Sequence, residues 1–398
     1  MKLADIAAYV TDRISSSEIS LFEYVTTDSL LQNKRGRDIA QNLPPVPCSL
    51  TKYHKGDVLV SNIRPYLKKV WLADTDGGCS NDVLVFRAME DHSHNFLYAV
   101  LLNDSFFEYA MQGAKGSKMP RGDKNQIMRY EIPTFSLSEE NVGKLVVDIM
   151  AKINLNRQIN DNLEEQLRLI TSRYIFGSPY LEKKRIGEIA TIKAGGDCPI
   201  TFSKTRTQEY NIPIFSNGTE DRGLYGFTNK ANIEGHSITV AARGTIGYCE
   251  RRLMPFVPII RLLAITPKEN GAYIYLHQVI RGMKFKKNGS VQQQLTVPEI
   301  SFIEIPYPHS SVLHEYNNVA SPIVEMIERN INENEILTKQ RDELLPLLMN
   351  GQAMVNYHLS VLFITKIMLY YKETNINFRY ERNNNTKRFR WNESGSVC

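Results

Sequence analysis

Apolar side chains recur at alternating steps of three and four in two stretches of the chain, which is the spacing of a coiled-coil seam. In the first stretch, residues 144–176 contain no Gly or Pro. The same seam returns near the end of the chain, with Ile153 and Ile327 lying 174 positions apart. The pattern predicts two long helices, over residues 138–178 and 311–352.

Both predicted seams contain asparagine where leucine would bury more apolar surface. Each substitution gives up about 1.5–3 kcal/mol of hydrophobic burial, and an unpaired buried amide costs more. Amides that meet across the interface avoid this cost and fix the register. We therefore expect the helices to pack antiparallel, with two equivalent units related by a pseudo-twofold axis. The predicted seam residues are Ile153, Asn156, Asn160, Leu163, Ile327, Asn330, Asn334 and Leu337. The alternative is that each helix covers only its own domain.

Short sequence landmarks also repeat in the same order in both halves of the chain. LADIAAYV at 3–10 is echoed by IGEIATIK at 186–193, and GDVLVSNIRP at 56–65 by HSITVAARGT at 236–245. An Ile-Pro pair occurs at 132–133 and again at 305–306, each time before a predicted long helix. Such a repeat indicates a duplicated unit of roughly 175–180 residues.

Between the helices, short β-branched segments bounded by Gly, Asn or Pro predict strands. Mixed with shorter helical stretches, they favour an α+β fold: two tandem, pseudo-twofold-related α+β domains separated by two long antiparallel coiled-coil helices. The expected organisation is a first domain at 1–137, a helix at 138–178, a second domain at 179–310, a helix at 311–352 and an atypical tail at 353–398.

The net charge of the chain is unevenly distributed along the sequence. The net charge of the 398 residues is +5, but residues 356–398 alone contribute seven basic and three acidic side chains. The body is nearly neutral, so a polyanion partner requires local basic patches. The five cysteines are scattered without a CxxC pair, which argues against disulfides and a zinc site. The N-terminal segment lacks the apolar core of a signal peptide, and we expect a cytoplasmic protein.

The common sequence motifs of enzymes are absent or incomplete in this sequence. There is no GxxxxGK[ST] phosphate loop and no GxGxxG that opens a helix. NLPPV at 42–46 resembles an amino-methyltransferase loop only superficially, and His92 and His94 have no third metal ligand nearby in sequence. The sequence therefore predicts neither a catalytic site nor a metal site.

Basic and amide side chains gather instead before each Ile-Pro pair and in neighbouring loops. Gly and Ser allow close approach to a phosphate that Lys and Arg neutralise, and Gln can hold an adenine edge through two hydrogen bonds. The candidate DNA-binding residues are Lys34, Arg35, Arg64, Lys68, Lys69, Lys115, Ser117, Lys118, Arg121 and Lys124 in the first half, and Arg206, Arg222, Arg243, Lys286, Lys287, Ser290, Gln292, Gln293 and Gln294 in the second. The alternative for each residue is a solvated loop side chain. Because such sets of basic and amide residues occur in both halves, they favour double-stranded DNA as the binding partner.

Over about residues 1–352 the chain resembles the DNA-specificity subunit of type I restriction-modification systems. The resemblance rests on KGDVLVSNIRPYLKKVW, GGCSNDVLVFRA, SITVAARGTIGY, the NGSVQQQL to IPYP run, INLNRQINDNLEEQ and IERNINENEILTKQRDELLPLLMNG. It implies two target-recognition domains, each reading one half of a split DNA site, joined by paired helices that act as a spacer. Because the two halves differ in sequence, the target is expected to be asymmetric.

The resemblance also implies partners. The helices would dock two methyltransferase subunits and, through them, the motor-nuclease subunits. Catalysis, S-adenosylmethionine, ATP and Mg²⁺ would belong to those partners, with no cofactor in this chain. Two other interpretations stay open: a coiled-coil scaffold or phage-type DNA mimic that binds protein only, and an enzyme with an unfamiliar site.

After Gly351 the sequence departs from the family pattern. The tail combines an apolar stretch, an Asn- and Arg-rich stretch and Cys398, and it has no counterpart in the first half. We interpret it foremost as read-through or recombined coding sequence. A basic arm on DNA and an extra partner-binding helix are the alternatives.

Overall fold

The computed structural model describes residues 1–133, 138–177, 181–285 and 294–349. The chain divides into two compact units, one formed by Met1–Asn154 with the chain from Glu335 onward, the other by Leu155–Asn334. Two long helices, α5 (Glu139–Thr171) and α9 (Ser310–Met349), contribute residues to both units. The predicted tail lies outside the described residues.

In the first unit, β1 (Ala7–Tyr9), β8 (Val83–Ala88), β5 (Val58–Ser61) and β6 (Val70–Leu72) form an antiparallel sheet in the order β1-β8-β5-β6. A second sheet has the order β2 (Arg13–Ser15), β4 (Ser49–Tyr53), β7 (Gly77–Cys79), β3 (Tyr24–Val25). The helices are α1 (Leu3–Ile6), α2 (His94–Leu102), α3 (Asp104–Gln112) and α4 (Lys124–Ile127). All four residues of β5 are buried, which explains its continuous apolar run.

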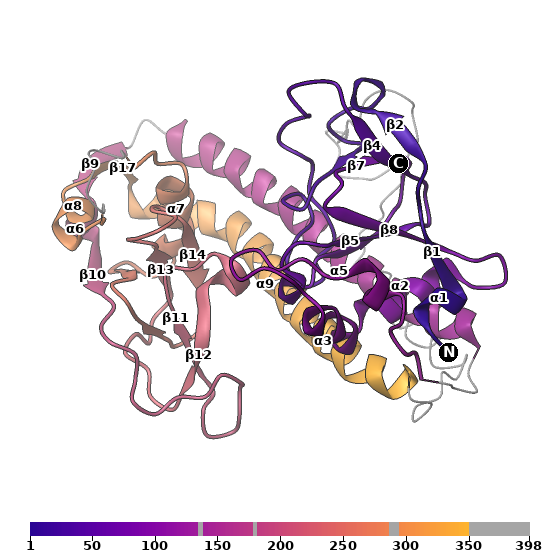
Figure 1. The fold of residues 1–398 in the computed structure, drawn as a ribbon. Helices are drawn as coiled ribbons and strands as arrows, with labels where there is room; N and C mark the ends of the chain where they lie inside the picture. Colours follow the sequence, from indigo (N-terminus) through magenta and orange to yellow (C-terminus); the bar gives the residue numbers. More distant parts are fainter. Residues whose placement is uncertain (134–137, 178–180, 286–293, 350–398) are drawn as a thin grey trace. The chain divides into compact units, whose positions relative to one another are not determined.

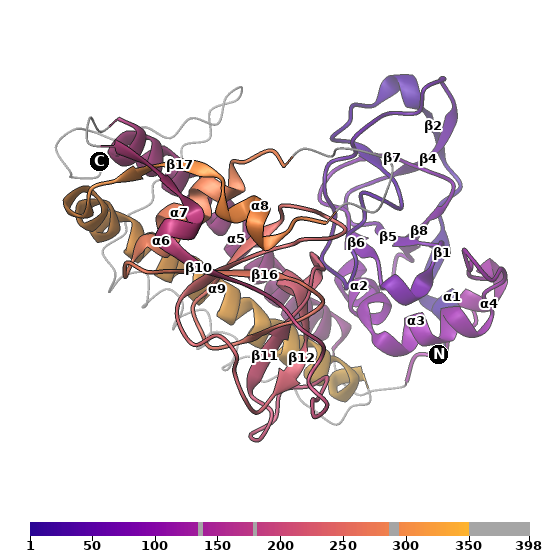
Figure 2. The same cartoon turned by 90° about the vertical axis from the view of Figure 1, so that its left-hand side faces the viewer.

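In the second unit, β10 (Ala190–Ala194), β16 (Leu263–Pro267), β13 (Ser237–Val240) and β14 (Cys249–Arg252) form a sheet in the order β10-β16-β13-β14. β12 (Leu224–Thr228), β11 (Ile212–Phe215) and β15 (Val257–Pro258) form a smaller sheet. The strands β9 (Leu181–Arg185) and β17 (Glu304–Pro308) pair near the short helices α6 (Ile186–Ile189) and α8 (Val297–Ser301), as Figures 1 and 2 show, and α7 (Ala272–Arg281) follows β16.

The sheet β1-β8-β5-β6 of the first unit and the sheet β10-β16-β13-β14 of the second are built alike, which gives the sequence repeat a structural basis. In each unit a four-residue helix leads into the edge strand of this sheet. The third strand in each order, β5 or β13, is buried and carries the repeated landmark. The Leu3 amide donates to the Tyr130 carbonyl at 2.9 Å, and the Ile186 amide donates to the Ile303 carbonyl at 3.0 Å. The coarser part of the α+β prediction, a fold that mixes helices with sheets and contains long helices, is confirmed.

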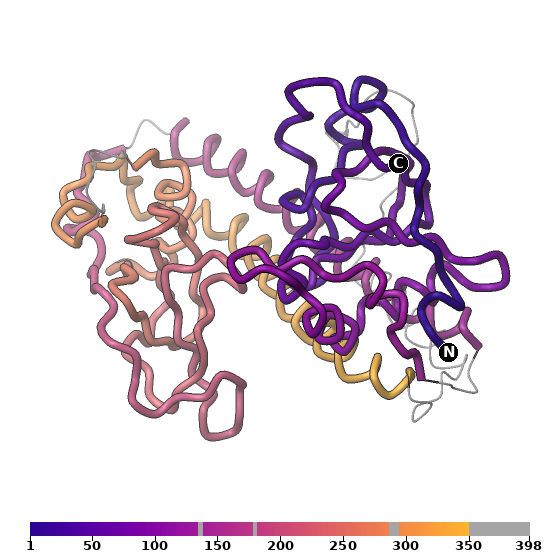
Figure 3. Tube along the Cα trace, in the orientation of Figure 1, coloured from indigo at the N-terminus to yellow at the C-terminus, as the bar shows by residue number. Residues whose placement is uncertain are grey.

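The long helices run antiparallel within each unit. In the first unit, Val146 and Ile153 of α5 share a core with Leu337 and Leu348 of α9. Figure 3 shows the purple trace around α3 beside the yellow part of α9. In the second unit, Leu167 of α5 shares a core with residues from the start of α9. α5 ends in a single π-helical turn, Ser172–Phe176. The predicted helices begin at 138 and 311, and α5 and α9 begin at Glu139 and Ser310; the predicted ends at 178 and 352 lie outside the described residues.

Candidate nucleic-acid interface

A short hairpin after α3 presents the basic segment of the first unit. The backbone groups of Lys115 and Arg121 exchange two hydrogen bonds of 2.9 Å, and Gly116 supplies the positive φ of +99° that the tight turn needs. The hairpin is fastened to the end of β5, where the Arg64 amide donates to the Pro120 carbonyl at 2.8 Å. Residues 113–122 and 62–64 therefore form one structure, although they are far apart in sequence.

The hairpin and the residues beside it carry exposed cations. Arg121 contacts Asp82 at 3.0 Å yet stays 57% exposed, and Lys115 lies 3.8 Å from Asp123 and stays 86% exposed. Tyr66, two residues after Arg64, and Met119, two residues before Arg121, are each half exposed. We call this the hairpin surface; its exposed polar members are Arg64, Lys115, Ser117, Lys118, Arg121 and Lys124. Exposed cations together with exposed aromatic and apolar side chains suit contacts with phosphates and bases.

Other predicted contacts of the first unit face the protein. The Lys34 side chain is buried, and its Nζ lies 2.7 Å from Asp104 and 3.0 Å from Asp342. Lys68 shares Asp104 at 2.9 Å, while Lys69 donates to the Thr27 carbonyl. Burial alone would raise the pKa of Asp104, but the two lysines outweigh it and lower that pKa. The prediction that Lys34 contacts DNA is corrected, because a buried ammonium that bridges two carboxylates has no access to a phosphate. Arg35 is half-buried, and its Nε donates to the Gln32 carbonyl.

In the second unit, the structure brings together two predicted residues that lie 51 positions apart. The exposed Arg243 guanidinium donates to the Gln294 side-chain oxygen at 2.8 and 3.2 Å. Arg206 is exposed on the long loop between β10 and β11. The predicted residues Lys286, Lys287, Ser290, Gln292 and Gln293 lie outside the described residues, and their role stays a prediction.

Arg222 is the second correction. Its guanidinium donates to Glu250 at 2.8 Å and makes two bonds of 3.1 Å to Glu328 on α9. Burial opposes its charge, yet the two carboxylates raise the pKa of Arg222 further above its ordinary value. Its neighbours on β14, Arg251 and Arg252, are each 4% exposed. These arginines bind the unit together, and among the described residues of the second unit fewer predicted cations are exposed than the sequence predicts.

The second unit also contains an aromatic and basic group that was not predicted from the sequence. Phe202 and Tyr225 have ring centroids 5.6 Å apart, and the Lys204 ammonium lies 3.6 Å from the Tyr225 centroid. Phe202 is partly exposed, and Ile200 beside it in the sequence is fully exposed. The signal in the sequence was the isolated aromatic and lysine of TFSK within a polar stretch. Aromatic faces beside a cation suit stacking and phosphate contacts.

The asparagines of the helix seam face one another in the second unit. Asn156 is fully buried and donates to Asn334 at 2.9 Å and to Glu333 at 2.7 Å. Asn330 donates to Asn160 at 2.8 Å. Among the flanking seam residues, Ile153, Leu163, Ile327 and Leu337 are all buried.

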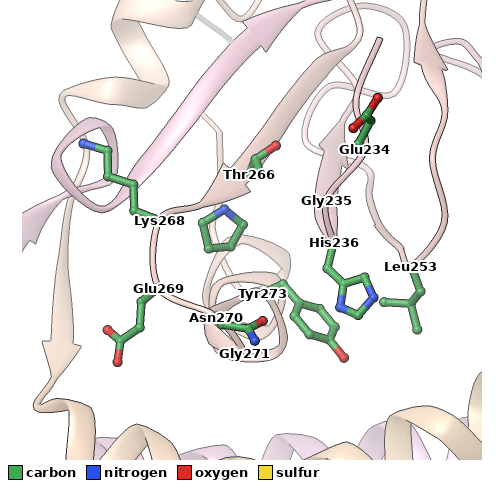
Figure 4. Close-up of a pocket in the computed structure, with 11 residues that line it drawn as sticks. Glu234, Gly235, His236, Leu253, Thr266, Lys268, Glu269, Asn270, Gly271 and Tyr273 are labelled. Atoms are coloured by element: carbon green, nitrogen blue, oxygen red, sulfur yellow. The ribbon is translucent and has the colours of Figure 1, made fainter. Parts of the chain in front are cut away.

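A shallow hollow of the second unit shows no convergent chemistry. It lies beside β13, β16 and the start of α7, and Figure 4 shows that Glu234, Lys268 and Glu269 do not point toward a common centre. His236 packs edge-on against Tyr273, with ring centroids 4.9 Å apart. Among the described residues, no three His, Cys, Asp or Glu side chains are grouped to hold a metal ion.

Cys48, Cys79, Cys198 and Cys249, the cysteines within the described ranges, are free thiols. None of the helices in this part of the chain is long and apolar enough to cross a membrane.

Comparisons with known proteins identify the family. The sequence pattern described as the type I restriction modification DNA specificity domain matches residues 181–345. A Mycoplasma pneumoniae protein named as the C-terminus of a type I specificity subunit is 32% identical over 129 residues, which are 31% of this chain and 88% of that protein. The chain belongs to the family of type I restriction-modification DNA specificity subunits.

Two further comparisons describe the extent of the similarity. Another Mycoplasma pneumoniae protein named as a type I specificity subunit is 33% identical over 172 residues, which are 42% of this chain and 51% of that protein. The chain thus spans about half the length of the first curated relatives it matches. The crystal structure of a type I restriction-modification S subunit from M. genitalium superimposes with a TM-score of 0.57 at 15% identity, covering 87% of this chain and 94% of that one. That likeness shows a shared fold.

Proposed function

We propose that this chain is a non-catalytic DNA-reading subunit that recognises an asymmetric, bipartite duplex target. Each unit reads one half-site. The observation that carries the proposal is the repeated four-stranded sheet, with exposed basic loops in each unit, built onto the same two helices.

The helices serve as spacer and scaffold in this proposal. With 33 residues in α5 and about 1.5 Å of rise per residue, a helix of this kind is about 50 Å long. Two methyltransferase subunits dock on the helices and carry motor-nuclease subunits with them. S-adenosylmethionine, ATP and Mg²⁺ are bound by those partners, and the assembly acts on DNA in the cytoplasm.

In the second unit, the proposed contacts are Arg206, Arg243, Gln294 and the group around Lys204. In the first unit they are the residues of the hairpin surface. Phosphate neutralisation by these cations would supply most of the affinity and make it depend on salt. Contacts to base edges would supply the sequence preference.

The test is a map of methylated adenines in cells that contain the methyltransferase partner, with and without this chain. We expect methylation that depends on the chain and falls on a split motif with two unlike halves. A continuous motif, or the same methylation without the chain, contradicts the proposal. Cleavage or methylation of DNA by the purified chain alone would contradict the non-catalytic assignment.

A further inference from the structure

Each unit contains a cation on a two-residue left-handed turn that reaches a carboxylate of α9. In the first unit the turn is Asn33–Lys34, with φ of 56° and 60°, and in the second it is Asp221–Arg222, with φ of 45° and 56°. Residues other than glycine rarely adopt positive φ unless surrounding contacts hold them there. Lys34 reaches Asp342, and Arg222 reaches Glu328.

Arg222 is held by several contacts at once. Its two Nη atoms meet both oxygens of Glu328 at 3.1 Å, its Nε donates to Glu250 at 2.8 Å, and Nη2 also donates to the Arg251 carbonyl at 3.1 Å. The Arg252 guanidinium donates to the Arg222 carbonyl and therefore fixes the backbone of the turn. The planar guanidinium fork gives these bonds a defined direction.

The same strand is tied to the other long helix. Arg251 of β14 forms an ion pair with Glu164 of α5, and Glu164 also accepts from Arg281 at 2.7 Å. Within the second unit, β14 is therefore linked to α5 by Arg251 and to α9 through Arg222 and Glu250. Apolar packing alone would permit small sliding of the sheet on the helices, whereas directional ion pairs restrict it.

The first unit has a simpler version of this arrangement. The Lys34 ammonium bridges Asp104 at the start of α3 and Asp342 on α9, and Arg341 holds the same Asp342 oxygen at 2.8 Å. Lys34 is therefore a link between the domain and the helix in the same way as Arg222.

We infer that Arg222–Glu328 and Lys34–Asp342 are positioning contacts that fix each unit on its helices and so set the separation of half-sites the protein accepts. The inference rests on the proposed reading of a bipartite target. Successive phosphates on one strand are about 3.4 Å apart along the helix axis, so a small shift of one unit changes the accepted separation by a base pair. Both cations are already neutralised by carboxylates, so removing either one should leave the number of counterions released on DNA binding unchanged.

The experiment compares Arg222→Gln with Arg243→Gln in the complex with methyltransferase subunits. Arg243 is exposed and is a proposed DNA contact, which makes it the matched control. Two quantities are measured: the salt dependence of binding to a random-sequence duplex, and the half-site separations found in the genomic methylation map. A third variant, Arg222→Lys, keeps the charge and loses the bidentate geometry.

For Arg222→Gln we expect the wild-type salt slope and an increase of about tenfold, equivalent to about 1.4 kcal/mol, in methylation at sites whose half-sites are one base pair closer or farther apart. Arg222→Lys should also increase methylation at these altered separations and keep the wild-type salt slope. Arg243→Gln should reduce the salt slope by about one and leave the separation unchanged.

A reduced salt slope in Arg222→Gln would show a phosphate contact and overturn the inference. An unchanged slope together with unchanged separations would overturn it as well. If circular dichroism shows that Arg222→Gln does not fold, Glu328→Gln and Asp342→Asn decide the question with the same two readouts. A wild-type complex that methylates no split motif would refute the proposed function itself, which is a distinct result.

Discussion

The side-chain amide of Asn330 donates to the side-chain oxygen of Asn160 at 2.8 Å. One turn away, Asn156 donates to Asn334 at 2.9 Å. Moving four residues forward on α5 thus moves four residues back on α9, as an antiparallel pair requires. The two amide contacts, Asn156 with Asn334 and Asn160 with Asn330, define the register of the helix pair within the second unit.

We predict that Asn330→Leu destabilises the protein by about 1–3 kcal/mol, because it leaves the Asn160 oxygen without this partner. The double variant Asn160→Leu with Asn330→Leu should recover much of that loss, since two apolar side chains can pack together. Urea unfolding of the wild type, the two single variants and the double variant measures the coupling free energy between Asn160 and Asn330. Asn332→Leu, at an exposed position of the same helix, is the control and should change stability by less than about 0.5 kcal/mol.

Replacing all of Asn156, Asn160, Asn330 and Asn334 by Leu should loosen the register. We expect a mixture of oligomeric states, detectable by light scattering, because the polar contacts that select one pairing are gone. Unchanged stability and a single unchanged oligomeric state would refute a role of the asparagines in register.

The buried His277 should make stability depend on pH. Arg251 donates to its Nδ1 at 3.0 Å, so that nitrogen must be unprotonated. Burial, and then Arg251 and Arg281, hold the pKa of His277 well below its ordinary value. The unfolded chain therefore binds a proton below about pH 6.5 that the folded chain does not bind. The stability from this group is fully present above that pH and falls by about 1.4 kcal/mol per pH unit below it.

Urea unfolding between pH 7.5 and 5.5 checks this expectation. In His277→Gln the decline should be shallower, because the substituted amide does not titrate. His309→Gln alters an exposed histidine and should keep the wild-type decline. Equal slopes in all three proteins would show that His277 does not titrate on unfolding as described.

The hairpin surface should contribute to the salt dependence of DNA binding. Replacing Arg64 and Arg121 together by Gln should reduce the slope of log affinity against log salt by about two, if each cation neutralises one phosphate. Lys55→Gln is the matched control, because Lys55 is exposed in the turn that precedes β5, whereas Arg64 follows its other end. Filter binding to a random-sequence duplex at several salt concentrations gives both slopes. An unaltered slope in the double variant would exclude phosphate contacts by this pair.

Lys286 and Lys287 remain predicted phosphate contacts on sequence grounds. Their joint replacement by Gln should weaken DNA binding and flatten its salt dependence, which the same titration measures. A slope equal to that of the wild type would count against both residues.

Deleting residues 356–398 should leave partner assembly intact. The core of the first unit already contains Leu345, Leu348 and Met349 from the end of α9. Size-exclusion chromatography with the methyltransferase partner measures assembly before and after the deletion. Loss of the complex would show that the tail takes part in it.

Local periodicity was enough to predict the long helices and the α+β class. The apolar spacing of three and four residues and the repeated landmarks can be read directly from the sequence. They do not depend on knowing which distant residues come into contact. The asparagines were conspicuous for the same reason, since a polar residue interrupts an apolar stripe wherever that stripe packs.

Tertiary structure decided which cations face solvent. In the sequence, Lys34 and Lys118 are both lysines in glycine-containing polar segments, and nothing local separates them. The burial of Lys34 depends on Asp342, 308 positions away, and the engagement of Arg222 depends on Glu328, 106 positions away. A charge is stable in the interior only beside such a partner, and the folded chain alone determines which residues become partners. The sequence by itself therefore determined the architecture, whereas the division of basic residues between internal links and an exposed surface required the fold.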